Sequence, residues 1–453
     1  MQYQNRNSAL DTESILFTLL RSPFSRESYN YNGSYLFKKM KSLTFIILAL
    51  LLFTNLNCQE ISKQEKILFG AELLLKENLE LLNDKQIGVV TNHSALLPNG
   101  VHLVDTLISS GINITALFSP EHGIRGEAID GENISSSIDH KTGLPIYSLY
   151  GKTKKPTPEM LKKVDLILFD IQDIGARFYT YISTLYYLLQ SSAENNFPVI
   201  VLDRPNPISG NHIEGPLLKP GYKSFIGIAP IPVKHGMTVG ELANYFVKEN
   251  IINTKNEPEL KVIKMSGWHR GYFWNNLNRK WIPTSPNIPK FETTIVYPGT
   301  CLLEGTNISE GRGTYDPFLN IGAPFINSND LIAMLNNIQI AGIDITSIKF
   351  TPKKIAGKSN NPKFEGEQCN GIKISVSDET KFKPVEFGVY LISALIKLYP
   401  EEFRFKPDYF DNLAGNSKLR TELQNGKEPF QIINSWVNDL KEFKIIRNKY
   451  LLY

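Results

Sequence analysis

Four apolar runs between residues 87 and 202 each end at a group of polar, reactive side chains. The runs span residues 87–90, 114–118, 164–169 and 199–202, and the segments between them are long enough for crossover helices. Buried strands joined in this way form a parallel sheet that helices cover on both faces. Ligands bind outside the carboxyl ends of the strands in such sheets. The pattern therefore indicates an α/β enzyme or a small-ligand-binding protein.

The polar groups that follow these runs contain the side chains expected at a ligand site. In chain order they include Asn92, His93, Glu121, His122, Asp170, Asp173, Arg177, Tyr179 and Arg204. Any one of them could instead cap a helix or form a structural ion pair. Burying so many charges without a ligand is costly, so the cluster as a whole favours a binding or catalytic role.

The first 58 residues are expected to be a targeting segment rather than part of the fold. Met40 and Lys41 precede an apolar run at residues 43–53, which Cys58 closely follows. A basic start, a short apolar core and a nearby cysteine are typical of a lipoprotein signal peptide, and Met40 is an alternative start. Residues 55–57 depart from the usual small residues before the cysteine, so plain secretion or an uncleaved anchor stays open. We predict an exported protein that is lipidated at Cys58, touches the membrane only there and has residues 59–66 as a tether.

The composition after Cys58 argues against a nucleic-acid-binding role. Of the 49 Lys+Arg and 45 Asp+Glu in the whole chain, 43 and 42 remain, so the exported part is nearly neutral. Cys301 and Cys369 permit one disulfide or two buried thiols. No pair of histidines has the spacing of a metal-binding helix, and we predict neither a metal nor a cofactor.

The chain after the tether divides into two expected domains. Apolar residues at helical spacing predict helices at residues 69–82, 178–195 and 239–248, the last with Thr238 as its N-cap. An aromatic, proline-rich connector at residues 268–298 follows, and beyond it the pattern is mixed. We expect a domain built on the parallel sheet at residues 67–290. A smaller α+β domain is expected at residues 291–453.

Familiar catalytic and nucleotide-binding motifs are absent from the chain. It contains no G-x-S-x-G elbow, S-x-x-K pair, Walker loop or G-x-G-x-x-G after a strand. These absences argue against lipase, penicillin-binding, nucleotide-binding and dinucleotide-binding functions. Carboxylate, arginine and aromatic chemistry remains.

Six sequence blocks resemble the signature of a known glycosidase family. They are residues 119–123 (SPEHG), 169–181 (FDIQDIGARFYTY), 202–207 (LDRPNP), 235–242 (HGMTVGEL), 285–287 (SPN) and 304–314 (EGTNISEGRGT). In content and order they resemble the NamZ-type exo-β-N-acetylmuramidases, and the similarity runs from residue 69 to the C-terminus. The resemblance implies a Rossmann-like N-terminal domain and a smaller C-terminal domain, with the active site between them.

The resemblance implies a hydrolase that removes single N-acetylmuramic acid units from the non-reducing ends of peptidoglycan fragments. An exported enzyme of this kind would meet these fragments in the periplasm. Two other functions stay open, namely a lipoprotein that captures peptidoglycan fragments without turnover, and a hydrolase of an amide or ester bond with His122 or His235 as base. The oligomeric state is not predicted.

Glycosidic cleavage needs a proton donor and a second group that acts as base or nucleophile. We expect Glu121 to be the acid, because the loop after its strand holds it at the edge of the site. Asp170, Asp173 and Glu310 compete for the second role. Tyr179 could stabilise the transition state or replace a carboxylate.

The lactyl carboxylate of N-acetylmuramic acid is best matched by the planar fork of an arginine. Arg177, Arg204 and Arg312 are the candidates, although each could pair with an internal carboxylate instead. We expect hydrogen bonds to the rest of the sugar from Asn92, His93, His122 and His235. Trp268 and Trp281 are candidates for stacking on the sugar face.

Overall fold

The computed structural model describes residues 66–121, 123–124 and 137–453. The predicted signal peptide with Cys58, the tether up to residue 65, and His122 lie outside the described residues. Within the described part of the chain, no helix combines the length and the apolar character needed to cross a membrane.

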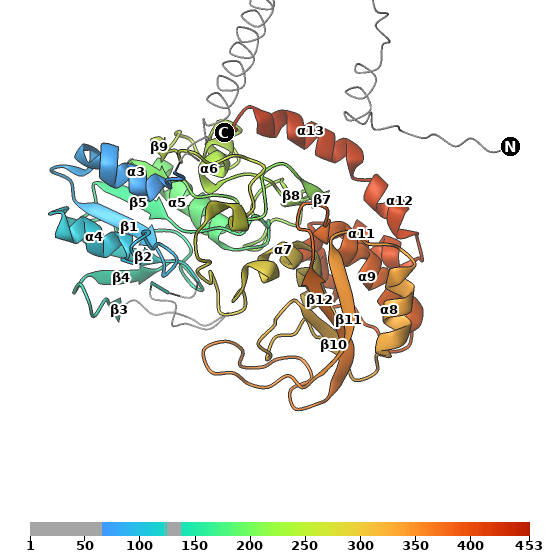
Figure 1. Ribbon diagram of the computed structural model, residues 1–453. Helices are drawn as coiled ribbons and strands as arrows, with labels where there is room; N and C mark the ends of the chain where they lie inside the picture. The colour runs from blue at the N-terminus through green and yellow to red at the C-terminus, as the bar shows by residue number, and fades with distance from the viewer. Residues whose placement is uncertain (1–65, 122, 125–136) are drawn as a thin grey trace, which may run out of the picture. The chain divides into compact units, whose positions relative to one another are not determined.

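A seven-stranded sheet forms the first part of the described chain, in the order β3-β4-β2-β1-β5-β6-β9. The strands are β1 Ile87–Thr91, β2 Ile114–Ser119, β3 Ser137–Ile138, β4 Pro145–Ser148, β5 Leu166–Asp170, β6 Val199–Leu202 and β9 Leu260–Ile263. All neighbours pair in parallel except β3 and β4. The α/β fold class is confirmed, and each of the four apolar runs supplies one strand (Figure 1).

Side chains that alternate along the strands point into two separate apolar layers. Leu168 packs in one layer with two helices, whereas the next residue, Phe169, packs in the other layer with two more. The first pair is α3 (Gly70–Glu77) and α4 (Leu103–Ser109), and the second pair is α5 (Tyr181–Asn195) and α6 (Val239–Lys248). Helices therefore cover both faces of the sheet, as the sequence predicts.

The predicted helices form with small shifts of their boundaries. The segment 69–82 contains α3 and the short 3-10 helix η1 (Leu79–Leu82), and the helix predicted from residue 178 begins at Tyr181. Helix α6 has the predicted bounds, and Thr238 is its N-cap. The Thr238 hydroxyl accepts a hydrogen bond from the backbone N–H of Glu241, and the Glu241 carboxylate accepts one from the backbone N–H of Thr238, which is a capping box.

A three-stranded antiparallel sheet in the order β10-β12-β11 forms the second part. Its strands are β10 Asn320–Ala323, β11 Ile343–Phe350 and β12 Cys369–Val376. Helices α8 and α9 lie on one side of it (Figure 1). The helices of this part are α7 Phe291–Thr300, α8 Ser328–Asn336, α9 Pro384–Leu398, α10 Pro407–Ala414, α11 Lys418–Gln424, α12 Pro429–Asn434 and α13 Val437–Asn448. The remaining elements are the strand pair β7 Glu214–Leu217 and β8 Pro232–Lys234, and the 3-10 helices η2 Trp274–Leu277 and η3 Cys301–Gly305.

The two parts pack together, because residues 66–453 cluster into one compact unit. The last residue, Tyr453, returns to the first part of the chain. Its hydroxyl donates to the Asp203 carboxylate and accepts from the backbone N–H of Met265, each at 2.7 Å. The division at residue 290 stays a prediction.

Helices α7 and α9 cross at two glycines. A methyl group on Gly299 would overlap the backbone carbonyl oxygen of Pro384, and one on Gly388 would lie 2.7 Å from the carbonyl oxygen of Gly299. Only hydrogen at both positions allows this close approach, which packs α7, and η3 directly after it, against α9 within the second part of the chain.

We expect Gly299→Ala to lower the free energy of unfolding by about 3 kcal/mol, because the added methyl group meets backbone that cannot move aside. Helix propensity alone predicts the opposite sign, a gain of about 1 kcal/mol. Urea denaturation of the wild type and of Gly299→Ala gives the difference in their free energies of unfolding. Gly271→Ala is the matched control, since its methyl group would meet only the end of the Asn211 side chain, at 3.1 Å. Equal stabilities of Gly299→Ala and the control would contradict the crossing.

Candidate active site

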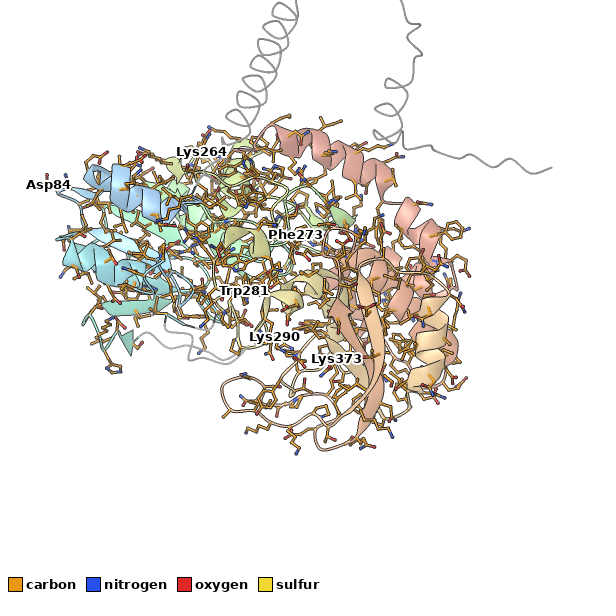
Figure 2. All side chains as sticks on the ribbon, in the orientation of Figure 1. Asp84, Lys264, Phe273, Trp281, Lys290 and Lys373 are labelled. Carbon is orange, nitrogen blue, oxygen red and sulfur yellow. The ribbon has the colours of Figure 1, made fainter. Side chains whose placement is uncertain are left out.

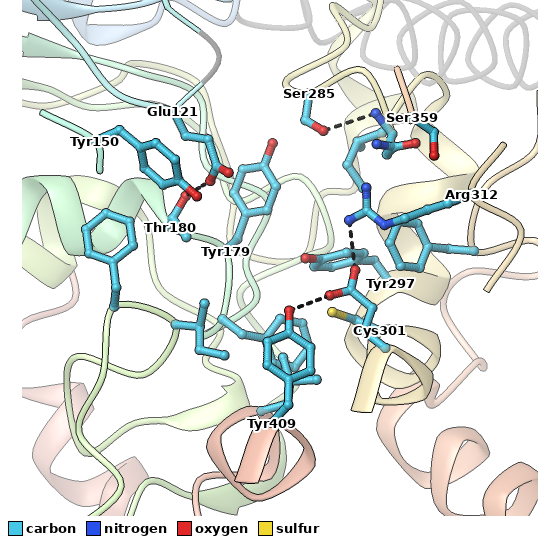
Figure 3. Close-up of a pocket in the computed structure, with 18 of the residues that line it drawn as sticks. Glu121, Tyr150, Tyr179, Thr180, Ser285, Tyr297, Cys301, Arg312, Ser359 and Tyr409 are labelled. Atoms are coloured by element: carbon cyan, nitrogen blue, oxygen red, sulfur yellow. Dashed lines mark hydrogen bonds and ion pairs between the residues drawn. The ribbon is translucent and has the colours of Figure 1, made fainter. Parts of the chain in front are cut away.

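A polar cavity of about 720 Å³ lies where the two parts of the chain meet. The first part contributes residues that follow β2, β4 and β5. The second part contributes residues of η3, of the segment before β10 and of the loop after β11. Figure 3 shows Glu121, Tyr150 and Thr180 on one side, with Arg312, Tyr297 and Cys301 on the other. The volume of the cavity lies in the range of small-ligand sites.

Glu121 occupies the first side of the cavity because β2 ends just before it. The strand stops at Ser119, and Pro120 has no backbone N–H with which to continue the sheet. The hydroxyl of Thr180, the N-cap residue of α5, donates to Oε2 of Glu121 at 2.8 Å. One strand end and one helix start therefore position this carboxylate, which is partly exposed to the cavity.

Glu304 occupies the second side, in the 3-10 helix η3. Its Oε1 accepts a hydrogen bond from the Arg312 guanidinium at 2.8 Å, and its Oε2 accepts one from the Tyr409 hydroxyl at 2.9 Å. Both oxygens of this carboxylate are thus oriented, and its side chain remains 15% exposed. The cavity has a carboxylate from each part of the chain.

Arg312 links the cavity to a buried carboxylate behind it. Its Nε lies 3.5 Å from Glu310, which also accepts a hydrogen bond from Lys363 at 2.9 Å. Burial opposes ionisation of Glu310, but the charges of Lys363 and Arg312 outweigh it and lower the pKa of this carboxyl group. Glu310 does not line the cavity and serves to hold the two cations.

Aromatic rings form the floor of the cavity. The Tyr297 ring packs edge-on against Phe178, Tyr179 and Phe318, at centroid distances of 5.4, 6.0 and 4.8 Å. Burial, with Cys301 and Glu304 nearby, raises the pKa of the Tyr297 hydroxyl well above its usual value. These rings give a ligand apolar surface next to the carboxylates.

Two lysines line the cavity without an ion-pair partner among the described residues, and both lie near aromatic rings. Lys154 lies 5.0 Å from the centre of the Phe225 ring, and Lys358 lies 5.6 Å from that of Tyr315. Lys154 is exposed, whereas Lys358 is half-buried, and its carbonyl oxygen accepts a hydrogen bond from Asn287 at 2.9 Å. The cavity therefore has positive charge available for an anionic group.

Of the predicted site residues, the structure brings Glu121, Tyr179 and Arg312 together at this cavity. The Tyr179 hydroxyl donates to Thr284 Oγ1 at 2.7 Å, and Arg312 is held between Glu304 and Glu310. Arg312 is thus already paired with carboxylates, which weakens its case as the anion-binding group.

Asp170 and Arg204 lie outside this cavity and pair with each other. Two hydrogen bonds of 2.5 and 3.0 Å join them, and both side chains are buried. Asp173 accepts from the backbone N–H of Gly175 at 2.7 Å and lies 3.6 Å from the ring of the buried His235. The predicted catalytic roles of Asp170 and Asp173, and the substrate-binding roles of Arg204 and His235, gain no support from these positions.

Arg177 is also structural in this arrangement. Its fully buried guanidinium donates to the carbonyl oxygens of Pro216, Ile231 and Leu413 at 2.7 to 2.9 Å. Burial lowers its pKa to about 9. The position of Arg177 does not place it against a substrate in the cavity.

Asn92 and His93 follow β1 and do not line the cavity. The side-chain oxygen of Asn92 accepts from the backbone N–H of Ser94 at 3.0 Å, and the His93 ring lies 2.6 Å from the carbonyl oxygen of Pro283. Trp268 is a buried core residue that packs against Tyr453. Trp281, labelled in Figure 2, is partly buried and packs against Trp274.

Sequence reasoning missed several cavity residues, notably Glu304, Tyr409 and Lys358. Glu304 is the first residue of the block at residues 304–314, so the sequence carried a signal for it. The prediction named Glu310, six residues later, instead. No local pattern marks Tyr409 or Lys358, because each reaches the cavity through a contact across more than 50 residues. The described residues contain no group of His, Cys, Asp or Glu that could hold a metal ion.

Two family models match the chain, the exo-β-N-acetylmuramidase NamZ N-terminal model over residues 87–292 and the C-terminal model over residues 295–453. The peptidoglycan β-N-acetylmuramidase NamZ of Bacillus subtilis (strain 168) is 48% identical over 394 residues, which are 86% of this chain and 92% of that protein. These matches define the chain as a glycosidase. It belongs to the exo-β-N-acetylmuramidase NamZ family, which confirms the resemblance of the sequence blocks.

Two crystal structures of DUF1343 family proteins from Bacteroides fragilis NCTC 9343 are similar to this structure. The first has a TM-score of 0.79 and 34% identity, and the match covers 86% of this chain and 99% of that chain. The second has a TM-score of 0.72 and 35% identity, and covers 85% and 99%. This chain therefore shares its fold with nearly the whole of both Bacteroides fragilis proteins.

Cys301 lines the cavity, yet we expect it to be chemically inert. It and Cys369 are free and buried. Burial and the nearby Glu304 raise the pKa of the Cys301 thiol well above its usual value, and burial raises that of Cys369 to about 11. Because the thiolate is the reactive form, iodoacetamide at pH 8 should leave Cys301 unmodified and the hydrolase active. Peptide mapping checks this, with urea-unfolded protein as the positive control, and rapid labelling of native Cys301 would show the assignment to be wrong.

Proposed function

We propose that this protein hydrolyses the glycosidic bond of terminal N-acetylmuramic acid at the non-reducing ends of peptidoglycan fragments. The observation that carries the proposal is the cavity itself, in which Glu121 and Glu304 approach from different parts of the chain among aromatic rings. Glycosidases commonly place two carboxyl groups about the scissile bond. The name of the Bacillus subtilis relative supports the choice of sugar.

Glu121 is the acid that protonates the leaving oxygen. It lies at the edge of the parallel sheet where open α/β folds bind ligands, and the Thr180 hydroxyl fixes one of its oxygens at 2.8 Å. The side chain lines the cavity, where a glycosidic oxygen would lie. General acid catalysis by a positioned carboxyl group contributes ~10²- to 10⁴-fold to the rate.

Glu304 is the second carboxylate. Arg312 and Tyr409 donate to its two oxygens and hold it in one orientation, at 2.8 and 2.9 Å. A fixed negative charge stabilises the positive charge that develops on the sugar in the transition state. Among the other carboxylates considered, Asp170, Asp173 and Glu310 each lie outside the cavity lining.

Lys358 binds the lactyl carboxylate of the substrate. Its ammonium group lies at the cavity without a carboxylate partner among the residues described, whereas Arg312 is compensated by Glu304 and Glu310. The hydrogen bond from Asn287 to its carbonyl oxygen anchors the Lys358 backbone to the cavity. A charge-assisted hydrogen bond to the lactyl group would distinguish N-acetylmuramic acid from N-acetylglucosamine, which lacks that group.

The site of action proposed for the enzyme is the periplasm. The support is the apolar run at residues 43–53 followed by Cys58, the pattern of a lipoprotein signal. A lipid on Cys58 and the short tether after it would hold the enzyme at a membrane surface, where peptidoglycan fragments are its substrates. Comparing membrane and soluble fractions for the wild type and Cys58→Ser tests this location.

We expect Glu121→Gln to lower kcat on a chromogenic β-N-acetylmuramide by at least about 100-fold, because the amide cannot donate the proton that the leaving group needs. Glu292→Gln, which makes the same chemical change at an exposed position of α7, should leave kcat unchanged. Retained activity in Glu121→Gln would remove this residue from the acid role. Binding of the muramide without turnover by the wild type would instead favour a capture protein.

We expect Lys358→Met to raise KM for the muramide by about 10- to 100-fold with little change in kcat, because a charged hydrogen bond is lost that forms equally in the bound and transition states. The ratio of kcat/KM for the muramide to that for the matching N-acetylglucosaminide should fall by the same factor. Lys154→Met, at the other cavity lysine, and Lys152→Met, just outside the cavity, are the controls. An unchanged ratio in Lys358→Met, or a fall in Lys154→Met instead, would refute this assignment.

A further inference from the structure

A second cavity, of about 310 Å³, lies at the carboxyl ends of β1 and β5. The order of the sheet places this point where the chain changes direction, since β2 and β4 lie on one side of β1 while β5, β6 and β9 lie on the other. In open α/β sheets the two loops at such a switch point diverge and leave a crevice that binds ligands. Ser94, after β1, and Gln172, after β5, both line this second cavity.

The segment at residues 281–288 separates the second cavity from the catalytic one. Ile282 lines the second cavity, whereas Ser285 lines the catalytic cavity. The segment is fixed from both directions, because the His93 ring contacts the Pro283 carbonyl oxygen at 2.6 Å and the Tyr179 hydroxyl donates to Thr284 at 2.7 Å. The two cavities share this wall and no lining residue among those described.

Gln172, which lines the second cavity, has an unused hydrogen-bond acceptor. Its side-chain N–H groups donate to the carbonyl oxygens of Asp173 and Pro205 at 2.7 and 2.8 Å, which fixes the orientation of the amide. Its side-chain oxygen is buried and has no partner in the described part of the chain. Leaving a buried acceptor unpaired is costly, so a ligand N–H group at this position would be stabilising.

Positive charge surrounds the same cavity. The guanidinium carbons of Arg279 and Arg204 lie 4.0 and 5.8 Å from the centre of the Phe69 ring, and all three residues line the cavity. Asp170 and Glu72 compensate these two arginines. Lys280 is exposed at the cavity and forms no ion pair with any described residue, so the local balance favours an anion.

Most of the remaining lining is apolar. It includes Leu96, Leu97, Pro98, Trp274 and Ile282, together with Gly100 and one polar residue, Asn278. A ligand that satisfies the whole cavity therefore has an apolar side group, an N–H donor for Gln172 and an anionic group for Lys280. The volume is at the lower end of the range for small-molecule sites.

We propose that the second cavity binds a small N-acylated amino acid or short peptide with a free carboxylate. Its apolar side chain packs against Leu97 and Trp274, its amide N–H donates to Gln172, and its carboxylate faces Lys280. The site is independent of the catalytic cavity and does not depend on the identity of the sugar that the enzyme cleaves.

Binding of N-acetyl-L-leucine to the purified protein, followed by ligand-observed NMR, tests the proposal. We expect a Kd on the order of 1 mM, as suits a ligand of this size. Lys280→Glu should raise the Kd at least about fivefold through charge repulsion at the cavity. Lys264→Glu makes the same charge change at an exposed position outside the cavity and should leave the Kd unchanged. N-acetyl-L-leucinamide, which lacks the carboxylate, should bind as weakly as the acid binds to Lys280→Glu.

Two further readings separate this site from the catalytic one. Lys280→Glu should retain full muramidase activity, and free N-acetylmuramic acid should not displace N-acetyl-L-leucine. Leu97→Trp, which fills the cavity, should abolish binding, and its circular dichroism spectrum reports whether it has folded. The proposal is overturned by the absence of saturable binding in the millimolar range, by equal binding of acid and amide, or by displacement by the sugar.

Discussion

The buried guanidinium of Arg177 is the interaction on which the catalytic cavity depends. It follows β5 in the first part of the chain, and it donates to carbonyl oxygens of Pro216, Ile231 and Leu413, the last at the end of α10 in the second part. Isolated burial of a charge would be prohibitive, and three carbonyl oxygens replace the lost hydration. The same helix α10 carries Tyr409, which orients Glu304. Fixing α10 against the first part therefore also fixes the distance between the two sides of the cavity.

The distribution of ion pairs explains which charged residues are left for chemistry. Asp170 and Arg204 form a buried pair, and the buried Glu310 pairs with the partly exposed Lys363. A buried pair of this kind is destabilised strongly by loss of one member, which makes each member a poor candidate for a group that must change its protonation state. Glu121 is in a different setting, because it lines the catalytic cavity and accepts a hydrogen bond from the neutral hydroxyl of Thr180.

The sequence was sufficient for the parallel sheet and for the position of Glu121, because both depend on local signals. Apolar runs of strand length define β1, β2, β5 and β6, and the carboxyl ends of parallel strands must lie at one edge. The roles of the arginines could not be predicted in the same way. Arg177, Arg204 and Arg312 occur in equally polar blocks, and what separates them is which carbonyl or carboxylate the fold brings to each. That partner lies 236 residues away for Arg177, and no local pattern encodes a contact of that range.

The segment at residues 281–288 shows how a region without regular structure can be essential to a site. Its prolines and aromatic residues have no helical or strand period, and the sequence indicated only a connector. In the structure, hydroxyl groups of Tyr179 and Tyr181 hold Thr284, and the His93 ring contacts Pro283. These contacts come from the loops after β1 and β5, so the wall between the two cavities is attached to the strand ends at the switch point. The strand ends at the switch point therefore hold in place the wall that keeps the two cavities separate.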